Sequence, residues 1–289
     1  MESPTRDEVV RAAAEFDIDT QIAEELLQPA SKPRAEFRRA HAYVVLHFPA
    51  LRHSHKTREQ EVDFVVGKNF IVTAHYDTID PLHKFSKVFE VNAMLDTDTV
   101  GEHAGFLFFY MLKKLYRAVE HELEYVRHDL KLIEDHVFSG YEVEMVATIS
   151  RGSRDLLNLR QTIEPHREML QELEAGGVAF WGEGFRPYLR TLSNEYYRVH
   201  NHIMRSTEFL HELRETNNSL LTTKQNETMR VLTIMALFTF PLALLVAILG
   251  MDAAGNPVLG STNDFWIIIG AVMSVGIAMF VFFKHKKWL

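Results

Sequence analysis

"VLTIMALFTFPLALLVAILGM" occupies residues 231–251, and "FWIIIGAVMSVGIAMFVFF" occupies residues 265–283. Neither stretch contains a charged residue. At about 1.5 Å per helical residue, each can cross a hydrocarbon core of roughly 30 Å. Because only a short polar connection separates them, the two runs predict a transmembrane hairpin rather than a buried helix pair in a soluble protein.

The basic residues around these stretches predict their orientation. Lys224 and Arg230 precede the first stretch, and Lys284, Lys286 and Lys287 follow the second. The connection "DAAGNPVLGSTND" contains no basic residue. Since cytoplasmic flanks are enriched in Lys and Arg, we expect both termini in the cytoplasm and the connection outside.

The remaining composition excludes several classes of protein. The net charge is −8 and nearly all the charge lies in residues 1–230, so phosphate repulsion argues against a nucleic-acid partner. There is no cysteine, which excludes disulfides and thiol chemistry. We find no Walker loop, Gly-x-Ser-x-Gly or His-Glu-x-x-His motif. The sequence therefore predicts neither an enzyme nor a cofactor.

The first hundred residues predict a small α/β domain. Residues 5–28 indicate one or two short helices that break near 17–19, and residues 40–51 indicate a strand. Residues 61–77 predict two strands joined at Gly67-Lys68-Asn69, and the pattern is helical after Pro81.

Long helices are expected after residue 105. The pattern predicts one helix over 105–137, a second over 141–175 that ends at Gly176-Gly177, and a third from about 186 to 250. The third carries an apolar stripe with gaps close to a heptad repeat: Phe185, Leu189, Leu192, Tyr196, Val199, Ile203, Leu210, Leu213 and Leu220. This helix would pack on other helices and continue into the first apolar stretch.

Residues 226–252, "NETMRVLTIMALFTFPLALLVAILGMD", resemble the pore helix of the CorA family of divalent-cation channels and transporters. The ending "KHKKWL" resembles the family's basic tail, and "GKNFIVTAH" (67–75) resembles a strand pair of its cytoplasmic domain. The family's pore helix usually ends in Gly-Met-Asn, whereas this sequence has Gly250-Met251-Asp252.

The resemblance implies a funnel-shaped homopentamer in an inner or plasma membrane, with an α+β cytoplasmic domain, long helices and a two-helix transmembrane hairpin. Its expected segments are the cytoplasmic α/β domain (1–100), the long-helix region (101–230), the pore-lining helix (231–251), the external loop (252–264), the second transmembrane helix (265–283) and the basic cytoplasmic tail (284–289).

By position in the family helix, the resemblance also implies a row of pore-lining residues with 3–4 spacing, the spacing of one helix face. They are Asn226, Met229, Leu232, Ala236, Phe240, Ala243 and Ala247. Gly250, Met251 and Asp252 would form the outer mouth. Asn226 and Asp252 would be the metal ligands, and Leu232 and Phe240 would form apolar rings that gate by shedding water.

Asp252 stands where the family presents a ring of amide oxygens. Five carboxylates there would attract cations more strongly and would repel one another, which predicts tighter ion capture, a pH-sensitive mouth, or both. A solvent-exposed acid at a helix end is the alternative. It is disfavoured because the helix dipole opposes a negative charge at a C-terminus.

Weaker patterns suggest further metal sites. His53 and His55 could ligate a soft metal, but there is no third ligand nearby. His200 and His202 point apart on a helix. Glu168, Glu172 and Glu174 indicate either an acidic helix tip that gathers cations or a solvated turn.

Closure of the pore by cytoplasmic Mg²⁺ is not expected. Thr191 occupies the place of the helix acid that the resemblance would require, and Glu195, Glu208 and Glu215 on the same helix read as solvated surface.

The sequence predicts passive influx of a divalent cation, with Mg²⁺, Co²⁺, Ni²⁺ and Zn²⁺ all left open, and with membrane lipid and further copies of the chain as partners. Two alternatives remain open. One is a proton-coupled zinc transporter of the ZntB type, and the other is a membrane-anchored helical sensor or scaffold that conducts nothing.

Overall fold

A computed structural model describes residues 1–49, 59–76, 103–251 and 263–286. Within them the chain divides into two compact units, Met1–Asn217 and Asn218–Leu289. The first unit contains a four-stranded sheet and most of the helices, and the second contains two apolar helical segments. The predicted strand and helix beyond these ranges, at 50–51 and after Pro81, lie outside the described residues.

Two short helices open the chain, as the sequence predicts: α1 (Arg6–Phe16) and α2 (Thr20–Glu25). Thr5 and Glu8 form a reciprocal capping box that satisfies the free amides at the start of α1. Asp17 ends α1 in the left-handed conformation, with φ of 52°, which Asp tolerates better than most residues. The predicted break near 17–19 is confirmed.

The four strands form an antiparallel sheet in chain order: β1 (Arg34–Phe37), β2 (His41–Pro49), β3 (Glu59–Gly67) and β4 (Ile71–His75). The predicted strand within 40–51 and the hairpin at 67–69 are confirmed. β1 is not predicted from the sequence, since its four residues are too few and too polar to show an alternating pattern. Pairing with β2 makes it a strand.

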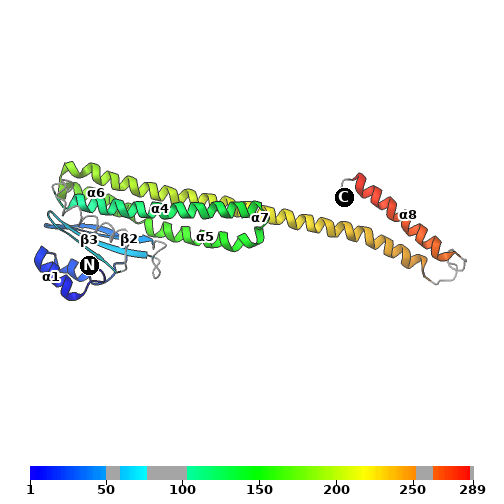
Figure 1. Cartoon of the computed structure of the whole chain (residues 1–289), viewed down its shortest axis with the longest axis horizontal. Coiled ribbons are helices and arrows are strands. Elements are labelled where there is room, and N and C mark those ends of the chain that lie inside the picture. Colours follow the sequence, from blue (N-terminus) through cyan, green and yellow to red (C-terminus); the bar gives the residue numbers. More distant parts are fainter. Residues whose placement is uncertain (50–58, 77–102, 252–262, 287–289) are drawn as a thin grey trace, which may run out of the picture. The chain divides into compact units, whose positions relative to one another are not determined.

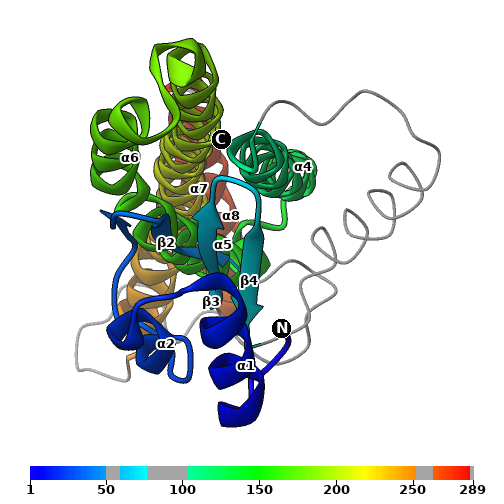
Figure 2. The ribbon, with the colours of Figure 1, turned by 90° about the vertical axis from the view of Figure 1, so that its left-hand side faces the viewer.

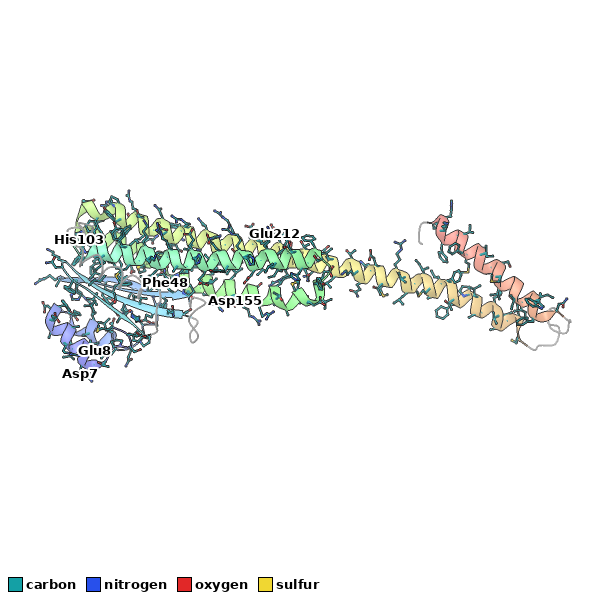
Figure 3. All side chains as sticks on the ribbon, viewed as in Figure 1. Asp7, Glu8, Phe48, His103, Asp155 and Glu212 are labelled. Atoms are coloured by element: carbon teal, nitrogen blue, oxygen red, sulfur yellow. The ribbon has the colours of Figure 1, made fainter. Side chains whose placement is uncertain are left out.

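Side chains that alternate along the strands build a core on each face of the sheet. α1 and α2 lie on one face and the long helices on the other (Figures 1 and 2). Tyr43 and Val45 pack against α1 and α2. Val44, Leu46 and Phe48, the last labelled in Figure 3, pack against the long helices. The Phe48 ring centroid lies 5.6 Å from that of Tyr116 and 5.2 Å from that of His166. The sheet is thus covered on both faces.

The long helices are α4 (Gly105–Phe138), α5 (Glu142–Ile163), α6 (His166–Trp181) and α7 (Arg186–Leu249), with a short 3₁₀ turn, η1 (Glu183–Phe185), before α7. The helices predicted from 105 and from about 186 are confirmed. α7 contains 64 residues, about 96 Å at 1.5 Å per residue, and contributes to both units.

The predicted apolar stripe is the buried face of α7. Eight of its nine residues are buried, from Phe185 to Leu213. Leu220, the partly exposed exception, lies beyond Asn217, where the first unit ends.

The single helix expected over 141–175 is wrong. It is two helices, α5 and α6, separated at Glu164 and Pro165. Proline has no amide hydrogen to continue the α5 ladder, and its fixed φ suits the start of a new helix. Gly176 and Gly177 do not end a helix either, because both lie inside α6.

Gly176 is needed because the Phe37 ring lies against its backbone. A Cβ at this position would stand 2.2 Å from Cδ2 of Phe37. We expect Gly176→Ala to lower the free energy of unfolding by about 1–2 kcal/mol, since overpacking outweighs the gain in helix propensity. Urea denaturation measures this change. Gly184→Ala is the control, because no atom lies within 4 Å of its added Cβ. Equal stabilities of the two variants would contradict the clash.

Two buried polar groups hold the sheet to its neighbours. His166 is fully buried; Tyr116 donates to its Nδ1 at 3.0 Å, and its Nε2 donates to the His47 carbonyl at 2.7 Å. Burial lowers the pKa of His166 to about 3, so the ring is neutral. On the other face, Nε2 of His47 lies 3.1 Å from a carboxylate oxygen of Glu61, whose other oxygen accepts the Ala30 amide at 2.8 Å.

Asp63 is the exception among these groups. Its carboxyl group is completely buried, and neither oxygen has a hydrogen-bond partner within the described structure. Burial, and then the neighbouring Glu61 carboxylate, raise the pKa of Asp63 to about 8. The carboxyl group is therefore mostly protonated in the fold at neutral pH.

Candidate functional site

The candidate site lies on the last part of α7. Two helical segments, within Glu183–Leu249 and Phe265–His285, are long and apolar enough to cross a membrane, and none of the apolar window of either is buried. The second segment is α8 (Asp264–His285). Helices that expose this much apolar surface need lipid or further protein around them.

The seven residues expected to line a pore all lie on α7 before its end at Leu249. Six are exposed, among them Asn226, Met229, Leu232 and Phe240, and Ala236 is partly exposed. Phe240 is the most exposed of the large ones, at 73%. α7 continues through Pro241 as one helix, so the row keeps a single helical phase.

The opposite face of this part of α7 is the covered one. Its partly buried apolar residues are Ile234, Phe238, Leu242, Leu245 and Leu249. A Cβ added to Gly276 of α8 would stand 3.9 Å from Leu242 and 4.0 Å from Phe238, so α8 packs here. At 100° per residue, the mean directions of the covered set and of the seven candidates lie roughly 170° apart. The candidate face is thus the one that α8 leaves free.

The candidate outer mouth begins where α7 ends. The amide of Gly250 still donates to Val246 O at 2.9 Å, and that of Met251 donates to Ile248 O at 3.4 Å. Asp252 lies outside the described residues, and so do His53 and His55. The helix therefore ends before the position that would first meet an entering ion.

The first-unit acids of α7 differ from one another. Glu208 and Glu215 are exposed, as expected, and Glu215 pairs with His211 at 3.4 Å. The expectation that Glu195 is solvated is wrong: it is 4% exposed and pairs with Arg198 at 3.1 Å. Thr191 donates its hydroxyl to Pro187 O at 2.8 Å.

No group of three or more metal-ligating side chains occurs among the described residues. The structure separates His200, which stacks on Tyr196, from His202, which lies 2.7 Å from Arg127. Burial, and also the Arg127 charge, lower the pKa of His202.

The three acids of α6 do not form a cation-gathering tip. Glu174 pairs with Arg190 at 3.3 Å, and Glu172 accepts the Ala35 amide at 3.3 Å. Glu168, Glu172 and Glu174 all lie within α6, with Glu168 in its first turn, so the expected solvated turn is wrong.

Comparison with known proteins gives one family. Residues 1–286 match the model described as CorA-like Mg²⁺ transporter protein. The chain is 24% identical over 286 residues to the cobalt/magnesium transport protein CorA of Thermotoga maritima, covering 98% of this chain and 81% of that protein.

Two solved structures share the fold. The complete structure of the CorA magnesium transporter from Methanocaldococcus jannaschii has a TM-score of 0.85 at 18% identity, covering 100% of this chain and 90% of that one. The full-length CmaX protein has a TM-score of 0.75 at 16% identity, covering 99% and 87%. The α+β domain, the long helix and the second apolar helix predicted from the sequence are confirmed.

Proposed function

The chain belongs to the CorA-like Mg²⁺ transporter family, and from this we propose that it carries divalent cations inward through a homopentameric pore lined by α7. Family membership makes it a divalent-cation transporter of the membrane and not an enzyme. The proposal adds the pentamer, the passive direction of flux, a membrane-spanning hairpin over 231–251 and 265–283, and both termini in the cytoplasm.

The observation that carries the proposal is the uncovered face of α7. α8 packs on the opposite side, so copies arranged around an axis would cover the seven candidate residues with one another. A non-conducting anchor needs no polar group on this face. In this chain Asn226 is the first residue of the candidate row, and Asp252 comes after the last residue of the row in the sequence. These two positions supply oxygen ligands at opposite ends of an otherwise apolar row.

That arrangement suits a hydrated cation. Mg²⁺ loses water reluctantly, so amide and carboxylate oxygens at the mouths would hold its hydration shell rather than strip it. Between the mouths, Met229, Leu232 and Phe240 offer no ligand. Such a stretch conducts while it is wet and stops when it sheds water.

Flux into liposomes tests the proposal. The purified chain is reconstituted into liposomes that contain a dye for Mg²⁺ or for Zn²⁺, with and without a pH gradient. We expect Mg²⁺ entry that does not depend on the gradient. Protein-free liposomes and the variant Asn226→Leu, which removes the amide of one mouth, are the controls.

The other outcomes separate the rival functions. Zn²⁺ entry that requires the proton gradient would contradict passive influx and would favour proton-coupled transport. If neither ion entered liposomes that contain the folded protein, the result would contradict transport and would favour a non-conducting scaffold.

Phe240 allows a prediction about the apolar gate. Replacing Phe240 by Ala widens and wets the narrowest apolar ring of the proposed pore, so we expect the initial rate of Mg²⁺ entry to rise at least about threefold. Leu237→Ala is the matched control, since this exposed residue lies roughly 60° from Phe240 on the helix and roughly 90° from the mean direction of the seven candidate residues. Equal rates for both variants would contradict a gate at Phe240.

A further inference from the structure

The two N-terminal helices, α1 and α2, cover one face of the sheet (Figure 2). We call this helix pair, residues 6–25, the cover. Val9 and Phe16 of α1 and Ile22 of α2 pack in a core that is smaller than the one the long helices build on the opposite face. Segments held by fewer apolar contacts open more easily than the rest of a fold. The cover is therefore expected to open before the main core does.

Asp63 lies beneath the cover, in the middle of β3. Its neighbours in register are Val45 on β2 and Ala74 on β4, and both belong to the core under the cover. The hydroxyl of Tyr43, on the same face, is also buried without a hydrogen-bond partner in the described structure. An ionised Asp63 would be shielded from solvent here, with no hydrogen-bond donor among the described residues, which is costly.

The charges that act on Asp63 oppose its ionisation. Glu61 on the same strand and Glu25 of α2 are negative, and both favour the protonated form of Asp63. Arg34 of β1 is positive and acts in the other direction. Its guanidinium already pairs with Glu25 and, at 3.0 Å, with Glu36, so its charge is shared among carboxylates.

The other titratable groups of this face do not offset a second negative charge. Nε2 of His47 lies 3.1 Å from Glu61; burial alone would lower the pKa of His47, but this hydrogen bond outweighs burial and raises it. The charge of a protonated His47 therefore neutralises Glu61. Burial raises the pKa of Tyr43 and of Tyr76 above the ordinary 10.0, so both hydroxyls stay neutral. α1 faces this side of the sheet with apolar side chains.

We propose that the cover is a pH-operated device, which leaves the sheet when Asp63 loses its proton. Opening lets solvent reach the carboxylate. Hydrogen bonds on both sides of the cover hold the chain in place: the Ser3 amide donates to the His75 carbonyl at 2.8 Å, and the Ala30 amide donates to Glu61 at 2.8 Å. The cover can thus move while the sheet stays folded. The proposal does not depend on transport, so either can fail alone.

The pKa of Asp63 sets the pH range of opening. It is about 8 under the cover, against the ordinary 3.8 where solvent reaches the group. Between these values the closed form retains a proton that the open form has lost, so a rising pH favours opening. We expect the equilibrium constant for opening to rise about tenfold for each pH unit between about 5 and 7, and to level off above about 8.

Hydrogen–deuterium exchange of the full chain in detergent tests the proposal at pH 5, 6 and 7, with labelling times scaled to the intrinsic exchange rate at each pH. Protection of the α1 and α2 amides should fall about tenfold per pH unit. At each pH these amides should exchange at least about tenfold faster than those of α4, because the cover opens without unfolding of the main core. In Asp63→Asn the protection of the cover should not change with pH.

The control variant is Asp155→Asn, which removes an exposed acid of α5 and should behave like the parent. Three results would overturn the proposal: protection of the cover that does not change with pH in the parent, a fall with pH that persists in Asp63→Asn, or equal protection of the cover and α4, which would mean that only the whole unit unfolds.

A thiol placed beneath the cover gives a second readout. The chain has no cysteine and Ala74 is 0% exposed, so Ala74→Cys reacts with N-ethylmaleimide only when the cover opens. The labelling rate is measured with Asp63 present and in the Asp63→Asn background, and the ratio of the two cancels the pH dependence of the thiol itself. We expect this ratio to rise about tenfold from pH 6 to pH 7. A constant ratio would contradict the proposal.

Discussion

Replacing Asp252 by lysine is expected to abolish divalent-cation flux, with a fall of at least about a hundredfold in the initial rate of Mg²⁺ entry. In the proposed pentamer the change turns five negative charges at one mouth into five positive ones. Rings of acidic side chains select cations and rings of basic side chains select anions. No other single substitution in the proposed pore changes the charge at one level as much.

The variant Asp252→Asn tests the finer part of the same idea. It restores the amide found in the Gly-Met-Asn ending that this sequence resembles, and it removes the charge while it keeps an oxygen ligand. We expect flux to persist, with a half-saturating Mg²⁺ concentration raised about tenfold, because an amide dipole attracts a cation less strongly than a carboxylate does.

Asp264 provides the matched control, because it is the only other acidic residue in 231–283 and lies at the start of α8. Asp264→Lys should change the rate by less than about threefold. If both lysine variants abolished flux, the loss would come from the added positive charge on the outer surface in general and not from a charge at the pore mouth. If Asp252→Lys left flux intact, this residue would not belong to the mouth.

Asp63→Asn is expected to stabilise the first unit on the order of 3 kcal/mol near pH 7.5, and to change little near pH 4. The pKa of Asp63 is about 8 in the fold, against the ordinary 3.8. Between these values the unfolded chain has already released the proton that the fold retains. Stability therefore falls as the pH rises from about 4 to 8. Asparagine has a similar shape and no charge to bury, so it removes this dependence.

Thermal melting of the purified chain in detergent at pH 4, 6 and 8 measures the effect as the difference between variant and parent. The pKa of His166 is lowered to about 3, so its buried ring costs stability as the pH falls below its ordinary 6.5. That contribution is common to both proteins and cancels in the difference. Asp17→Asn, at the exposed end of α1, is the control. If the difference in melting temperature between the Asp63→Asn variant and the parent did not grow with pH, Asp63 would not be protonated in the fold.

Local patterns predict much of this fold, and the exceptions have identifiable causes. The helix break at 17–19, the turn at 67–69 and the stripe along α7 each depend on neighbours in sequence, and each is confirmed. β1 was missed because its register with β2 makes it a strand. Gly176-Gly177 was misread as a helix end because the Phe37 ring that requires glycine comes from a distant strand.

The candidate site, like the fold, could be predicted from the sequence only in part. The sequence by itself determined the two apolar stretches, the polar residues at 226 and 252 and the 3–4 spacing of the row between them, because length, charge and periodicity are properties of a single segment. Only the tertiary structure decided which face of α7 packs on α8 and that Asp63 and Glu195 are buried. Each of these depends on contacts between residues far apart in the chain, and the energy of a buried charge is set by those contacts.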